Sequence, residues 1–233
     1  MTADASGPES SPDDDVARLT DAQKSLRAQM LATEHWSLLA SRSTTQSEVL
    51  TRIAIFLTLV SAGLVTLGVL GNATEFRGWF GVAALGVLFL LVLLGVITQL
   101  RVFNTATEDL AYVLAMNRLR GAYVDLDPGV ARYFMMASTD DQAGAAQTYY
   151  PFASRDRSQV FASSMMLILL VNTTLVGLLV GALVYAFTGS VGWSIAVGVV
   201  AAIAEFVLWM SWGYRNYLNA LRVHVPMRRG DAA

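Results

Sequence analysis

The chain contains no cysteine, which excludes disulfide bonds, thiolate metal sites and cysteine nucleophiles. Proline and histidine are scarce, and only 15% of the residues are charged, against about 25% in a typical soluble domain. Lys24 is the single lysine beside fifteen arginines, a bias typical of GC-rich bacterial genomes. The net charge of -2 gives no reason to expect a nucleic-acid partner.

What the chain has instead is apolar residues, which make up 55% of the total and gather in four blocks. The blocks are 53–71, 79–100, 161–187 and 191–213, and no proline interrupts them. A helix needs about 20 apolar residues to cross about 30 Å of hydrocarbon. Too little polar chain remains to cover four such helices in water. The sequence therefore predicts an all-α, polytopic protein of the lipid bilayer, with four transmembrane helices and long cytoplasmic helical extensions.

Positive charge is distributed unevenly around these spans. The turn between the first two spans holds Arg77, and the turn between the last two holds no basic residue. All other basic residues lie in the N-terminal segment, the 101–160 connection or the C-terminal tail. Loops rich in Arg and Lys remain in the cytoplasm. We therefore expect a protein of the bacterial inner (plasma) membrane with both termini in the cytoplasm.

The polar segments complete the expected organisation. Residues 1–13 are acidic and poor in apolar side chains, which predicts disorder and differs from a signal peptide. Residues 14–50 lack Pro and Gly and predict a cytoplasmic helix that continues into the first span. A membrane-surface helix is the alternative, but its polar face would be rich in Lys and Arg. The remaining expected parts are a transmembrane hairpin (51–100), a cytoplasmic helical extension and loop (101–160), a second hairpin (161–213) and a cytoplasmic tail (214–233).

The connection between the two hairpins begins with a helical pattern and ends without one. Helical spacing continues through residues 101–126 and stops at the Asp-Pro-Gly sequence 127–129, where the aspartate can cap a new short helix. Residues 138–158 show no periodicity and predict a loop. Within it, Asp140 and Asp141 resemble half of a cation site. Without further spaced oxygen ligands, a solvated turn is the preferred interpretation.

Three stretches carry a family resemblance: "EHWSLLASRSTTQSEVLTRIAIFL" (34–57), "MNRLRGAY" (116–123) and "RYF" (132–134). Together they resemble an uncharacterised family of four-span integral membrane proteins of actinobacteria and related bacteria. The resemblance covers the larger part of the chain. It implies a shared architecture and supplies no activity, substrate or site.

One carboxylate, Glu205, lies inside an apolar block. A charge at mid-membrane costs about 2.5–3.5 kcal/mol on insertion scales, so this group faces the bundle, a wet cavity or another subunit, or it is protonated. Asn172 should lie within about 5 Å of the same depth in the neighbouring span. There it can donate to a carboxylate or accept from a carboxylic acid. The pair could form an ion-binding or pore-lining site, or it could be a hydrogen bond that stabilises the packing of two helices. The packing contact is the preferred interpretation.

Thr173 and Thr174 complete the set of candidate pore or ion-site residues, because they follow Asn172 in the same span. Gly177 and Gly181 form a GxxxG pair, which permits close helix packing within one chain or between chains. The two histidines lack metal-ligand spacing, and phosphate-loop, dinucleotide, HExxH and GxSxG motifs are absent. We therefore expect no metal site, no cofactor and no enzyme activity.

Two functions remain open. A homo-oligomeric ion channel is preferred, and it would need several copies of the chain because four helices leave little room for a water path. The alternative is a non-conducting scaffold or accessory subunit, whose cytoplasmic partners would contact residues 14–50 and 101–126. A secondary transporter usually has internal repeats and broken helices, which this sequence lacks.

Overall fold

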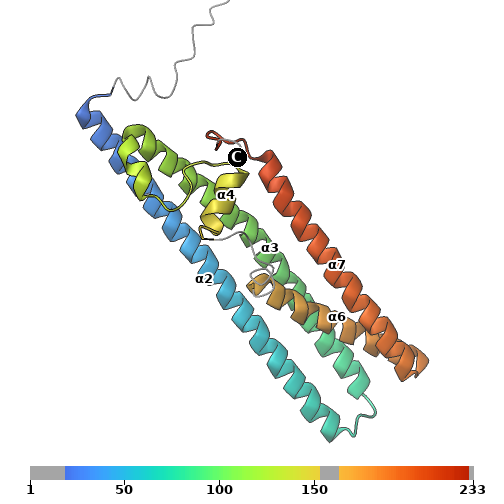
Figure 1. The fold of residues 1–233 in the computed structure, drawn as a ribbon. Helices are drawn as coiled ribbons and strands as arrows, with labels where there is room; N and C mark the ends of the chain where they lie inside the picture. Colours follow the sequence, from blue (N-terminus) through green and yellow to red (C-terminus); the bar gives the residue numbers. More distant parts are fainter. Residues whose placement is uncertain (1–18, 153–162, 231–233) are drawn as a thin grey trace, which may run out of the picture. The chain divides into compact units, whose positions relative to one another are not determined.

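The computed structural model describes residues 19–152 and 163–230, and these residues form helices joined by short connections, with no strand among them. They divide into two compact units: unit 1 contains 19–42, 109–152 and 225–230, and unit 2 contains 43–108 and 163–224. The elements are α2 (Asp21–Ala73), α3 (Phe80–Leu126), the 3₁₀ helix η1 (Pro128–Tyr133), α4 (Gln142–Tyr149), α6 (Ser164–Thr188) and α7 (Val191–Val223) (Figure 1).

Four helices, α2, α3, α6 and α7, are each long and apolar enough to cross a membrane. The prediction of four helices that can span a membrane is therefore confirmed. α3 continues without interruption beyond its apolar block to Leu126, as the periodicity predicted. α2 begins at Asp21, later than the expected residue 14, and residues 14–18 lie outside the described part of the chain. α7 likewise extends past its apolar block to Val223.

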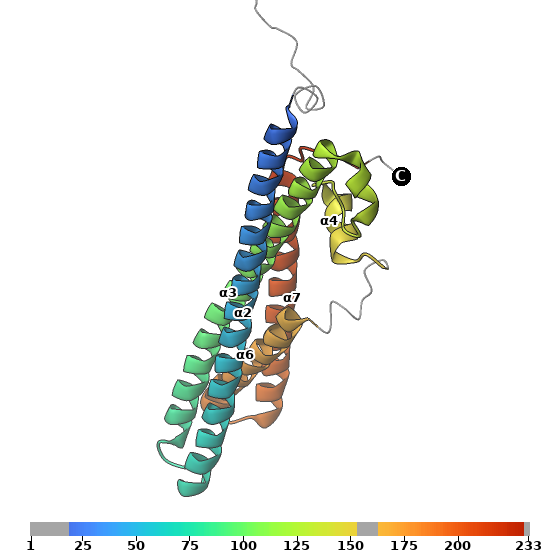
Figure 2. The same cartoon turned by 90° about the vertical axis from the view of Figure 1, so that its left-hand side faces the viewer.

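The apolar core of unit 2 is formed by helix faces on which the buried side chains recur every three or four residues. The residues that α2 contributes to this core are Val49, Ile53, Phe56 and Val60. They pack with Leu88, Leu91 and Val102 of α3 and with Ile168 and Leu175 of α6. Figure 2 shows the corresponding stretches of α2 and α3 side by side. Large apolar side chains on the outer faces, such as Ile55, Val65 and Phe89, are exposed, as lipid-facing residues would be.

α6 and α7 form a close hairpin within unit 2. α6 ends at Thr188 and is capped by Gly189, whose φ of 64° lies in the left-handed region that glycine tolerates. α7 begins two residues after this cap. A Cβ atom at Gly177 or Gly181 would lie 3.0 Å from the Gly198 or Ser194 carbonyl oxygen of α7. The GxxxG pair therefore packs inside one chain, where small residues let two backbones approach.

In unit 1 the N-terminal half of α2 packs through residues spaced alternately by four and three, the spacing of heptad packing. These half-buried positions are Lys24, Ala28, Leu31, His35, Leu38 and Arg42. The Asp109 carboxylate of α3 accepts hydrogen bonds from Arg42 Nε at 2.6 Å and from the Tyr149 hydroxyl of α4 at 2.7 Å. One acidic side chain thus joins α2, α3 and α4.

The loop predicted for 138–158 is wrong over part of its length, because Gln142–Tyr149 form the helix α4. Its N-cap is Asp141, whose carboxylate accepts a hydrogen bond from the Gly144 N–H at 2.8 Å. The predicted cap at Asp127 is confirmed: it accepts from the Gly129 N–H at 2.8 Å, with Pro128 beginning η1. Residues 153–158 of the predicted loop lie outside the described residues.

Candidate functional site

Three polar side chains meet between the apolar helices of unit 2: Gln99 of α3, Asn172 of α6 and Glu205 of α7, here called the polar triad. Asn172 Nδ2 donates to Gln99 Oε1 at 2.9 Å and to Glu205 Oε1 at 3.1 Å. Gln99 and Asn172 are fully buried, and Glu205 is partly exposed. The predicted meeting of Asn172 and Glu205 is therefore confirmed. Gln99 was not among the predicted site residues.

Gly95 makes room for the triad one turn before Gln99 on α3. A Cβ atom at Gly95 would lie 2.0 Å from Asn172 Oδ1 and 3.0 Å from the Phe56 ring. Real Cβ atoms do not approach an oxygen this closely, so only glycine admits the Asn172 amide here. The Gly95 Cα–H that takes the place of this Cβ points at the amide oxygen, in the direction of a weak C–H···O contact.

Each member of the triad keeps one buried polar atom without a hydrogen-bond partner: Gln99 Nε2, Asn172 Oδ1 and Glu205 Oε2. The Trp209 side chain approaches the Glu205 carboxyl without a hydrogen bond of normal geometry. A buried polar atom left unpaired costs about 1–3 kcal/mol, and lipid offers it no replacement for water. The site therefore has unused hydrogen-bonding capacity: one amide donor, one amide acceptor and one carboxyl oxygen.

The other predicted pore residues do not join the triad. The hydroxyls of Thr173 and Thr174 both donate to the Leu170 carbonyl oxygen of their own helix, at 3.1 and 2.8 Å. Thr173 is buried against the unit, whereas Thr174 is on an exposed face of α6. Hydroxyls of this kind make their hydrogen bonds within their own helix and need no partner on another helix.

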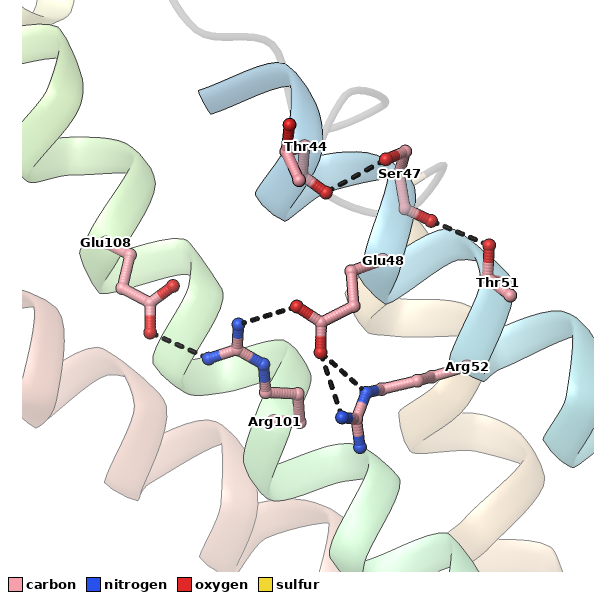
Figure 3. Close-up of polar contacts among 7 residues, drawn as sticks. All are labelled: Thr44, Ser47, Glu48, Thr51, Arg52, Arg101 and Glu108. Carbon is pink, nitrogen blue, oxygen red and sulfur yellow. Dashed lines mark hydrogen bonds and ion pairs between the residues drawn. The ribbon is translucent and has the colours of Figure 1, made fainter. Parts of the chain in front are cut away.

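A second polar cluster lies at the ends of the first two apolar blocks (Figure 3). Glu48 Oε1 accepts from Arg52 Nε at 2.9 Å, and Glu48 Oε2 accepts from Arg101 at 3.4 Å. Arg101 also donates to Glu108 at 2.7 Å. The hydrogen bond from Arg52, followed by the charge of Arg101, lowers the pKa of Glu48. Charges at this level can hold the spans at the membrane surface.

Asp140 is the centre of a third cluster, in unit 1. Its carboxylate is fully buried and accepts from the Arg118 guanidinium at 2.7–2.8 Å. It also accepts from the backbone N–H groups of Arg228 at 2.7 Å and Met227 at 3.2 Å. The solvated-turn interpretation is therefore wrong for Asp140, whereas Asp141 is partly exposed and caps α4. Their alternative as a cation site also lacks support, because no group of three or more acids or histidines suited to a metal exists in the described part of the chain.

The surroundings of Asp140 predict a loss of stability in acid. Burial alone would raise the pKa of Asp140, but the hydrogen bonds from Arg228, Arg118 and Met227 outweigh burial and lower this pKa below its ordinary value of 3.8. The folded state then binds this proton less readily than the unfolded state, so the stabilisation is complete well above pH 3.8 and is lost as pH falls through the folded pKa. The pKa of Asp141 is lowered too, with the same sign.

This pH dependence can be measured by hydrogen exchange of the residues around α4 between neutral and acidic pH. We expect constant protection near neutrality and a decline at acidic pH, with a smaller decline in an Asp140→Asn chain. Equal declines in both chains would contradict the assignment to Asp140.

The described residues thus define an all-helical protein with four helices able to span a membrane and a polar triad between three of them. No protein-family model, no curated protein and no solved structure matches this chain.

Proposed function

We propose that this chain is an integral protein of the bacterial plasma membrane that forms homo-oligomers and conducts protons past Glu205. The single observation that supports conduction is the polar triad, because a carboxyl group and two amides lie among apolar helices with part of their hydrogen-bonding capacity unused. Polar groups within membrane spans are costly, and those that persist usually mark ion or proton pathways.

The chemistry of the triad favours protons over metal cations. A metal ion would satisfy the oxygens of Asn172 and Glu205 and be repelled by the Gln99 amide hydrogens. Water both donates and accepts, so it suits the unpaired amide donor and the two unpaired oxygens alike. Water next to a carboxyl group is the arrangement that proton relays use.

The triad also bears on how a path would be formed. Gln99 and Asn172 are enclosed by helices of their own chain, so they do not face an axis shared by several copies. Glu205, on α7, is the one member of the triad that is partly exposed. We therefore place the proposed path along the Glu205 side of α7, where a second copy of the chain would cover it from lipid.

The test is proton flux into vesicles that contain the purified protein. An internal pH-sensitive dye reports the flux, which is driven by a potassium diffusion potential with valinomycin. We expect the wild-type chain to acidify the vesicles and Glu205→Gln to reduce the rate to that of protein-free vesicles, because an amide cannot exchange a proton at this position. Thr174→Val is a matched control, since it removes a polar group from an exposed face of α6 outside the triad.

Absence of flux in the wild-type chain, or equal flux in wild type and Glu205→Gln, would contradict conduction by this route. The first outcome would favour the alternative function, a non-conducting scaffold or accessory subunit. The predicted contacts of cytoplasmic partners with 14–50 and 101–126, and the resemblance to the actinobacterial four-span family, stay predictions. We propose no enzyme activity.

A further inference from the structure

The C-terminal segment Val225–Gly230, here called the tail, is bound by unit 1 much as a peptide is bound by a receptor. Its binding residues, here called the socket, are Arg118, Gly121, Asp125, Asp140 and Asp141. The Asp140 carboxylate accepts from the N–H groups of residues 227 and 228, and the Asp140 N–H donates to the Arg228 carbonyl oxygen at 3.1 Å. Asp141 accepts from the Gly230 N–H at 2.9 Å, and Arg118 donates to the Val225 carbonyl oxygen at 3.4 Å.

One side chain of the tail is recognised specifically. The Arg228 guanidinium forms an ion pair with Asp125 and donates to the Gly121 carbonyl oxygen at 2.9 Å. Arg229, the next residue, is exposed and has no ion pair among the described residues. The socket therefore binds an extended backbone with an arginine at position 228, and within the described part of the chain it makes no ion pair with the arginine at position 229.

Apolar contacts contribute little to this binding. The side chains of Val225 and Met227 remain 77% and 76% exposed. The tail is therefore held by hydrogen bonds and one arginine rather than by packed apolar side chains. It can therefore leave the socket without exposing a hydrophobic core.

The socket is held in shape by contacts that do not involve the tail. Arg118 pairs with Asp140, and Asn117 Nδ2 donates to the Thr139 carbonyl oxygen at 3.0 Å. Asp141 caps α4 and accepts from the Thr139 hydroxyl at 3.1 Å. Groups that are already oriented cost less entropy when they bind a ligand.

We propose that the socket is a peptide-binding site for an extended segment that carries one arginine, and that the tail of a second copy of this chain can occupy it in place of the chain's own tail. The chain's own tail competes because it is tethered, which gives it a high effective concentration. Weakening this tail should open the site to a peptide added in solution. The proposal does not depend on proton conduction.

The experiment measures binding of a fluorescent peptide with the sequence of residues 224–230 to the full-length protein in detergent. The Arg228→Ala chain, whose own tail has lost its ion pair, should bind the peptide at least about tenfold more tightly than the wild type. The Arg229→Ala chain is the matched control and should behave as the wild type does. Circular dichroism and size-exclusion chromatography establish that the three chains are equally folded.

Two further variants test specificity. A peptide with alanine at position 228 should not bind the Arg228→Ala chain, whereas a peptide with alanine at position 229 should bind it normally. A chain that combines Arg228→Ala with Asp140→Asn should lose the peptide. Absence of saturable binding to the Arg228→Ala chain would overturn the proposal, and so would equal binding of the two alanine peptides.

Discussion

An Asp140→Ala chain is expected to lose about 2–4 kcal/mol from the free energy of unfolding of unit 1. The substitution leaves Arg118 without its buried partner and two backbone N–H groups of the tail without an acceptor. Loss of one member of a fully buried ion pair costs about 3–5 kcal/mol, and the range is lower here because Arg118 is 42% exposed and water can replace part of what is lost. Hydrogen exchange of residues 109–152 measures the effect.

Asp127→Ala is the control for this prediction. Asp127 also caps a helix in unit 1, but it is exposed and accepts a hydrogen bond from Gly129 alone among the described contacts. Its replacement should cost about 1 kcal/mol, the usual effect of removing an N-cap. If both variants lost the same small amount of unfolding free energy, the buried contacts of Asp140 would not stabilise unit 1 more than a helix cap does.

A Gly95→Ala chain is expected to lose about 2–3 kcal/mol of stability in unit 2. The added methyl group would lie 2.0 Å from Asn172 Oδ1 and 2.8 Å from its Cγ. Asn172 would have to move, and it would then lose its hydrogen bonds to Gln99 and Glu205. The loss can be measured by unfolding in mixed micelles with increasing denaturing detergent, followed by circular dichroism.

Gly86→Ala separates this clash from the general effect of replacing a glycine in a helix. Gly86 lies in the same helix, and a Cβ atom there would meet no other atom within 4 Å. Alanine is a better helix former than glycine, so Gly86→Ala should be neutral or stabilise by up to about 1 kcal/mol. Stabilisation by Gly95→Ala as well would show that Asn172 does not occupy the space beside Gly95.

Local patterns predicted much of the architecture, because membrane spans satisfy their backbone within one segment. The four apolar blocks needed only their own hydropathy to be placed, and the extension of α3 needed only its periodicity. The meeting of Asn172 and Glu205 could be predicted because two antiparallel spans joined by a short turn have nearly fixed relative depths. In each case the information lies in one segment or in two adjacent ones.

Contacts between distant segments were not predictable in the same way. Gln99 lies at the end of an apolar block, where a polar residue normally marks the membrane surface, so it gave no signal of a partner on α6. Asp140 looked solvated because its partners, Arg118 and the tail, are 22 and 88 residues away in the sequence. α4 was missed because it is only eight residues long and contains Gly144, a poor helix former, although Asp141 at its start is a usual cap.

The glycine contacts between α6 and α7 have a consequence for the medium in which this protein is stable. A Cβ atom at Gly198 would lie 2.7 Å from the Gly177 carbonyl oxygen. The two main chains are therefore in direct van der Waals contact and are placed for weak C–H···O contacts. Such an interface is stabilised by close backbone packing and not by the exclusion of water. Lipid or detergent chains can replace the contacts of leucine side chains, but they cannot replace the close contact of two backbones at glycine. This hairpin should accordingly stay paired when the surrounding lipid is exchanged for a detergent of different chain length.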